Sequence, residues 1–221
     1  AMPCSCGSLA LLKSRAEFMT APAKQSRGIT RYTGVAIILH WLIAAGILTL
    51  IVMGLVMDHL SLDPMRVFQL YQLHKSIGIT VMVLIALRIV WRLTHRPPEL
   101  PGDMKGFERM AAHLTHAALY GLQIFMPLSG WAMVSVSALG IPTLLYGTIL
   151  WPDLPVLSTL QNKAPVEAAL KAVHHWGGWF LLALIVLHIA AALRHHFVLN
   201  DNILRQMLPA TGRKSASRHG D

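Results

Sequence analysis

Four stretches of this chain are long and apolar enough to cross a lipid bilayer as helices. A helix needs about 20 residues to span the hydrocarbon core, and the stretches cover residues 35–57, 74–93, 110–136 and 172–193. The third lies within a run from 111 to 152 that contains no Asp, Glu, Lys or Arg. Of all residues, 54% are apolar and only 13% are charged, a balance unlike that of soluble domains. We therefore predict an all-α membrane four-helix bundle.

The basic residues predict how the bundle is oriented. Lys and Arg are enriched on the cytoplasmic side of spans, and they concentrate in the N-terminal segment, in residues 88–109 and in the C-terminal tail. The other two connections hold only Arg66, Lys75, Lys163 and Lys171. This asymmetry predicts that both termini are cytoplasmic. It also accounts for the net charge of +9, so we expect no nucleic-acid binding.

The segments outside the spans suggest three regions. Residues 1–30 read as a flexible extension, residues 31–209 as the membrane domain, and residues 210–221 as a disordered tail. Cys4 and Cys6 have no His or Cys partners at zinc-site spacing, so we expect free thiols. The first long apolar run has the length of a span and lacks a small-residue cleavage pattern, so we expect no cleavable signal peptide.

The depths of the histidines sort them into groups. His174 and His188 are 14 residues apart, which places them within about 40° of the same helix face and about 21 Å apart along the axis. His175 then points to roughly the opposite side from His188. One face of the fourth span therefore presents two imidazoles at two depths.

The predicted topology supplies a partner at each depth. His40 and His188 both lie near the cytoplasmic ends of their spans, and His74 and His174 both open their spans from the outer side. These four histidines should therefore form an inner pair, His40 with His188, and an outer pair, His74 with His174.

Two imidazoles on opposite sides of a porphyrin can supply both axial ligands of a haem iron. Zinc or copper would usually gather three or four ligands at one depth, so two histidines per level favour two haems stacked across the bilayer. The alternative is four unrelated histidines, each bonded to backbone or water. Because the sequence has no C-x-x-C-H motif, we expect haem b, held without a covalent bond.

Several other side chains could serve these sites. Arg88 and Arg92 fall at the inner level and could pair with haem propionates. Lys75 and Lys171 flank the outer pair and could pair with propionates or attract an anionic donor. The alternative for each of these four residues is that its charged end extends to the lipid headgroups and has no role at a cofactor.

Two histidines open the third span near its cytoplasmic end. His113 and His116 could replace His40 or His188 as ligands, but the outer side has no equivalent histidine to complete a second pair. We expect them, and His116 in particular, to lie beside the inner haem or to face a quinone in the bilayer.

Segments of all four spans resemble one family. They read "RYTGVAIILHWLIA", "LHKSIGI", "RIVWR", "HLTHAALYGLQIFMPLSGW", "HHWGG" and "VLHIAAALRHHF". The pattern covers about residues 31–209 and is similar to the bacterial cytochrome b561 family of four-helix dihaem membrane cytochromes. The resemblance implies that the axial ligands are His40, His74, His174 and His188. The connection over residues 138–171 does not match the family pattern, so the resemblance identifies no substrate on the outer side.

The resemblance also implies a function and a location. It implies a transmembrane cytochrome b domain in the bacterial inner membrane that carries electrons between a periplasmic donor and a membrane quinone, with ubiquinone as the expected quinone. One branch of the family is similar to a superoxide:quinone oxidoreductase, which makes superoxide a candidate donor. An alternative is a haem-bearing anchor that accepts electrons from a partner dehydrogenase or hydrogenase subunit. A metal or proton transporter would be expected to carry acidic residues at mid-membrane, and the four stretches contain none.

Overall fold

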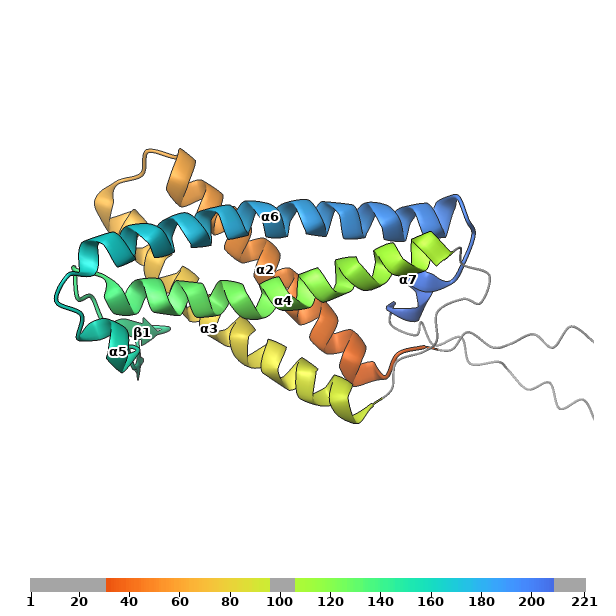
Figure 1. The fold of residues 1–221 in the computed structure, drawn as a ribbon, viewed down its shortest axis with the longest axis horizontal. Helices are drawn as coiled ribbons and strands as arrows, with labels where there is room; N and C mark the ends of the chain where they lie inside the picture. Colours follow the sequence, from red (N-terminus) through yellow and green to blue (C-terminus); the bar gives the residue numbers. More distant parts are fainter. Residues whose placement is uncertain (1–30, 96–105, 209–221) are drawn as a thin grey trace, which may run out of the picture. The chain divides into compact units, whose positions relative to one another are not determined.

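A computed structural model describes residues 31–95 and 106–208 (Figure 1). The predicted N-terminal extension with Cys4 and Cys6, most of the connection between the second and third spans, and the predicted tail lie outside these residues. Within the described residues, four helices are long and apolar enough to cross a membrane, which confirms the predicted helical bundle. They are α2 (Gly34–His59), α3 (Pro64–Thr94), α4 (Gly106–Val136) and α6 (Lys163–Phe197).

The helices α3 and α6 begin well before the apolar stretches on which they were predicted. The Asp63 carboxylate accepts a hydrogen bond from the Arg66 amide at 3.1 Å, and Pro64 takes the first helical position, where its missing N–H costs nothing. This start signal places the first residue of α3 ten residues before His74. The predicted spans are therefore the apolar inner parts of longer helices.

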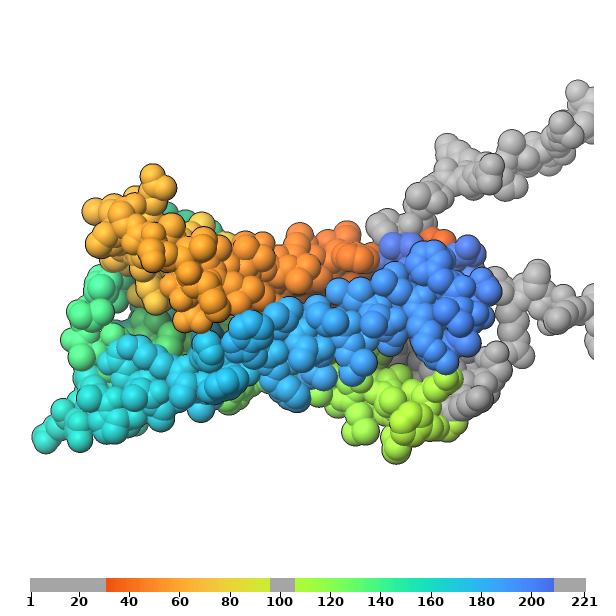
Figure 2. Space-filling model, turned by 90° about the horizontal axis from the view of Figure 1, so that it is seen from above, coloured from red at the N-terminus to blue at the C-terminus, as the bar shows by residue number. Residues whose placement is uncertain are grey.

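The bundle is built from two close helix pairs, α2 with α3 and α4 with α6, and α3 also contacts α4. Gly46 explains the close approach of the first pair, because a Cβ there would lie 2.5 Å from Cγ2 of Val81. Small residues let helix backbones come together inside membranes. Figure 2 shows α2 in orange and α6 in blue side by side toward one end of the molecule.

An aliphatic cluster fills the middle of the bundle. It draws on all four long helices and consists of Ile43, Ile47, Val81, Ile85, Leu119 and Leu181. On α6, Leu181 lies midway in sequence between His174 and His188. The cluster therefore separates the two levels at which the histidines lie.

The connection between α4 and α6 folds into a hairpin that was not predicted from the sequence. Strands β1 (Thr143–Leu145) and β2 (Ile149–Trp151) pair antiparallel. Tyr146 and Gly147 turn the chain with φ values of 49° and 77°. The Ser76 hydroxyl of α3 accepts a hydrogen bond from the Tyr146 amide at 3.0 Å, and the side chains of Thr80 and Tyr146 bond at 2.8 Å. The hairpin is therefore fastened to α3 close to His74.

Two short helices complete the described fold, α5 (Pro155–Ser158) after the hairpin and α7 (Ile203–Gln206) after α6. The segment after α7 turns back to α2, where the Trp41 indole donates a hydrogen bond to the Met207 carbonyl at 2.9 Å. Trp41 also packs edge-on against His40, with ring centres 5.5 Å apart. The chain after α6 thus supports the end of the bundle that carries His40.

Candidate cofactor sites

The structure brings the four singled-out histidines together as two pairs. His40 of α2 faces His188 of α6 with ring centres 6.4 Å apart and ring planes inclined by 67°. His74 of α3 faces His174 of α6 with the same separation of 6.4 Å and an inclination of 72°. Along α6 the two pairs are about 21 Å apart, given 1.5 Å per residue. Each pair joins one helix of the α2/α3 unit to α6.

The separation within each pair fits two axial ligands of one iron. Bonds between a metal and a histidine nitrogen are about 2.0 Å long, and that nitrogen lies about 1.1 Å from the ring centre, so two ligands in line have ring centres about 6.2 Å apart. Both pairs come within about 0.2 Å of this value at 6.4 Å. In the described part of the chain, no three His, Cys, Asp or Glu side chains form a group that could hold a metal ion. The histidine geometry therefore fits haem.

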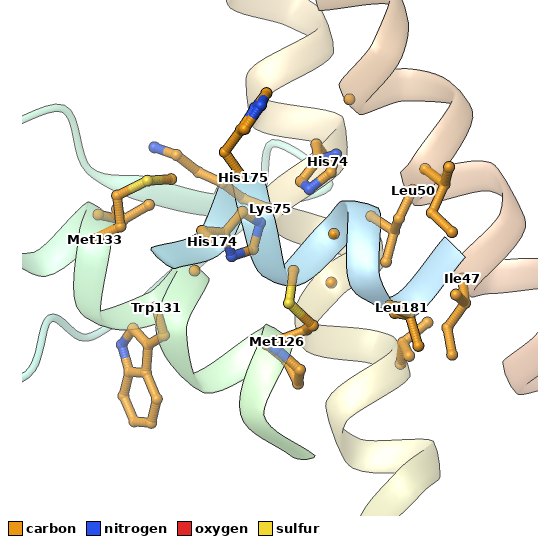
Figure 3. A pocket seen from close by; sticks show the side chains of 18 of the residues that line it. Ile47, Leu50, His74, Lys75, Met126, Trp131, Met133, His174, His175 and Leu181 are labelled. Atoms are coloured by element: carbon orange, nitrogen blue, oxygen red, sulfur yellow. The ribbon is translucent and has the colours of Figure 1, made fainter. Parts of the chain in front are cut away.

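A cavity of about 340 Å³ surrounds the His74/His174 pair. Its walls come from all four long helices and from the hairpin residues Thr143 and Trp151. Figure 3 shows His74 and His174 entering it from different helices; His175 also lines the cavity but leaves α6 in another direction. A Cβ added at Gly78, on the cavity wall, would meet no atom within 4 Å. The volume falls in the range of ligand pockets, and the lining is mostly apolar, as a porphyrin face requires.

Residues 31–210 match the model of the prokaryotic cytochrome b561 family. The chain belongs to this family. It is 33% identical to cytochrome b561 homolog 2 of Escherichia coli over 190 residues, which cover 86% of this chain and 95% of that protein. It is 29% identical to the probable superoxide oxidase CybB of Yersinia pestis over 181 residues, which cover 81% and 96%. Cytochrome b561 homolog 1 of Escherichia coli is also 29% identical, over 62% of this chain and 73% of that protein.

Family membership and four membrane-length helices together make the protein a bacterial membrane cytochrome. A cytochrome b561 carries b-type haem and takes part in electron transfer. Among the described residues, the two histidine pairs have a geometry that suits this cofactor.

The predicted cationic partners of the His40/His188 pair lie together on α3. Arg88 and Arg92 both lie over the ring of Tyr120, with guanidinium carbons 5.7 and 5.6 Å from the ring centre. Arg88 also donates a hydrogen bond to the Tyr120 hydroxyl at 3.3 Å. It lies close enough to His40 and His188 to interact with them electrostatically. Tyr120 of α4, which sequence reasoning missed, therefore contacts both guanidinium groups, and Arg88 lies beside this histidine pair.

His116 of α4 packs against the same pair. Its ring centre lies 5.5 Å from that of His188, which is shorter than ligands on opposite sides of one iron allow. His116 is exposed, whereas His40 and His188 are half-buried. His113 and His175 are also exposed. The arrangement places His116 beside the His40/His188 site.

The two lysines near the His74/His174 pair differ in their surroundings. Lys171 forms an ion pair with Glu167 on the same helix, with a nitrogen to oxygen distance of 2.7 Å. Glu167 also accepts a hydrogen bond from the Ala138 amide at 3.1 Å. Lys75 lines the cavity and has no carboxylate within ion-pair distance among the described residues, although the Asp153 carboxylate interacts with it at longer range. Of the two, Lys75 presents the less compensated charge.

Proposed function

We propose that this cytochrome holds two haem b groups, one between His40 and His188 and one between His74 and His174. The observation that carries the proposal is the equal separation of 6.4 Å in both pairs. Two unrelated pairs of interior histidines would have no reason to share a spacing close to that of axial ligands. The steep inclination of the ring planes is compatible with coordination, because each imidazole can rotate about its own iron bond.

We propose further that the protein passes electrons from superoxide on the outer side of the inner membrane to a quinone, with ubiquinone as the expected quinone. The name of the Yersinia pestis relative supports superoxide as the donor. The distribution of Lys and Arg supports an orientation with His74 and His174 outside and both termini in the cytoplasm. The balanced reaction oxidises two superoxide anions to two O₂ and reduces one quinone, which takes up two protons to become a quinol.

The protein's own residues would have distinct tasks in this reaction. Haem supplies reversible one-electron transfer. With one histidine of each pair on each side, the iron would have no open coordination position, so donor and quinone would exchange electrons without binding iron. Arg88 and Arg92 would neutralise propionates at the inner site, and Lys75 would place positive charge where the anionic donor arrives.

The ligand proposal is tested by counting haems. A pyridine haemochrome assay on the purified chain should give about two haems per polypeptide, and each of His40→Ala, His74→Ala, His174→Ala and His188→Ala should give about one. His40→Ala and His188→Ala should remove the same spectral component, because their rings form one pair. A ratio near zero in the wild type would refute the whole proposal. Loss of the same spectral component in both His40→Ala and His174→Ala would refute the pairing.

A further inference from the structure

The Ser129 hydroxyl of α4 connects the helix backbone to one of the proposed haem ligands. It donates a hydrogen bond to the Met126 carbonyl at 2.9 Å, and its oxygen lies 2.9 Å from Nδ1 of His174. Ser129 is 5% exposed, so water does not compete for these bonds. The two distances define a short hydrogen-bonded chain from α6 into α4.

The directions of these two hydrogen bonds fix which nitrogen of His174 carries the proton. A carbonyl can only accept, so the single hydroxyl hydrogen of Ser129 goes to Met126. The hydroxyl oxygen must then accept from Nδ1 of His174, which therefore carries the proton. Nε2 is left with a free lone pair, as an iron ligand requires.

A close helix approach makes the contact possible. A Cβ at Gly130 would lie only 3.2 Å from Cε1 of His174, so glycine at this position lets α4 lie directly against the imidazole. The other ring of the pair has no such support: Nδ1 of His74 is buried and has no hydrogen-bond partner among the described residues. Within this pair, the Ser129 bond therefore anchors one ring only.

We propose that Ser129 is a positioning residue that orients His174 and sets the reduction potential of the haem bound there. The inference rests on the proposed haem ligation. When a neighbouring group accepts a hydrogen bond from the nitrogen that does not bind the metal, the ligating imidazole becomes more basic. A more basic ligand stabilises ferric over ferrous iron, so the bond lowers the midpoint potential of the His74/His174 haem relative to the same site without it.

The test uses Ser129→Ala and Ser129→Thr in the full haem-loaded chain. In Ser129→Ala, the midpoint potential of the His74/His174 haem should rise and that of the other haem should stay constant. Loss of this haem to an apoprotein acceptor should become about tenfold faster, since such partners are typically worth 10- to 100-fold in metal affinity. The ferric EPR spectrum of this haem should also change, because a freed ring can alter the 72° angle between the two ring planes. Ser129→Thr keeps the hydroxyl and should restore all three values.

Ser135→Ala is the matched control. Ser135 lies on the same helix and is 3% exposed, but its hydroxyl donates to the Trp131 carbonyl and accepts from the Leu154 amide. Both potentials should stay at wild-type values in this variant. A His188→Ala background, which should keep only the His74/His174 haem, assigns the shifted component.

Each result decides the inference separately from the haem ligation. If the wild type binds two haems and Ser129→Ala leaves both potentials unchanged, or shifts both equally, the inference is wrong although the ligation stands. If Ser129→Ala loses one haem, retention in Ser129→Thr supports the hydroxyl role and loss in both variants overturns it. A wild type without two haems would instead refute the proposed function.

Discussion

Lys75 is the residue whose change most directly tests an anionic donor. Its side chain lines the cavity around His74 and His174. Removing one positive charge about 10 Å from a small anion in water changes the interaction energy by about 0.4 kcal/mol, which is about twofold in encounter rate. We therefore expect Lys75→Gln to slow haem reduction by superoxide about twofold at low ionic strength. Asp153→Asn should have the opposite effect, because it removes the carboxylate that partly offsets Lys75.

Lys171 and Glu167 provide an internal control. Their ammonium and carboxylate are 2.7 Å apart, so together they contribute little net charge. The double variant Lys171→Gln/Glu167→Gln removes a nearly neutral pair and should keep the wild-type rate. Lys171→Gln alone leaves the Glu167 carboxylate uncompensated and should slow the reaction much as Lys75→Gln does.

The assay is stopped-flow reduction of the purified oxidised protein by superoxide across a salt series. Screening shortens the reach of a charge from about 30 Å at 0.01 M salt to about 3 Å at 1 M, so the difference between wild type and Lys75→Gln should vanish as salt rises. A difference that persists at high salt would refute steering and would indicate that Lys75 acts through a propionate or through packing. A negligible wild-type rate would refute superoxide as the donor and favour the anchor subunit of a larger complex.

Two further predictions concern residues beside the sites. His175→Ala and His116→Ala should both retain about two haems, because neither ring lies opposite the other ligand of its site. Loss of a haem in either variant, measured by the haemochrome ratio, would show that the ligand set is wrong. Gly46→Ala should lower the midpoint temperature of thermal unfolding of the purified cytochrome, since its Cβ would lie 2.5 Å from Cγ2 of Val81. Gly121→Ala is the control and should leave that midpoint unchanged, because its Cβ would meet no atom within 4 Å. Equal midpoints in the two variants would contradict the close packing of α2 on α3.

The histidine pairs could be predicted because helix geometry and membrane topology together determine the face and the depth of each histidine. Within a span, the 3.6-residue period converts the spacing of His174 and His188 into a shared face and a depth difference. Between spans, the positive-inside rule gives each helix a direction, and that assigns His40 and His74 to levels. Neither step requires knowledge of how side chains pack.

The other features depend on contacts that neither rule describes. Ser129 and His174 are 45 residues apart, and they meet only because α4 approaches α6 at Gly130. The strands β1 and β2 have three residues each, too few for an alternating pattern to stand out. The three residues 146–148 between them include Gly147 and lie between apolar residues, which is a turn signal. The ion pair of Lys171 with Glu167 does have a local signal, the i,i+4 spacing, which a count of basic residues alone overlooks.

The arrangement of the ligands suggests why haem would hold this fold together. The strongest helix contacts are within the α2/α3 and α4/α6 pairs, and α3 with α4 provides the main contact between them. Each proposed haem would take one histidine from each half, His40 or His74 from the first and His188 or His174 from the second. Two iron sites about 21 Å apart along α6 would then fix both the distance and the rotation of that helix against α2 and α3. Because a group that binds only the assembled state stabilises it, haem would favour the closed arrangement of the two halves over any arrangement in which they separate.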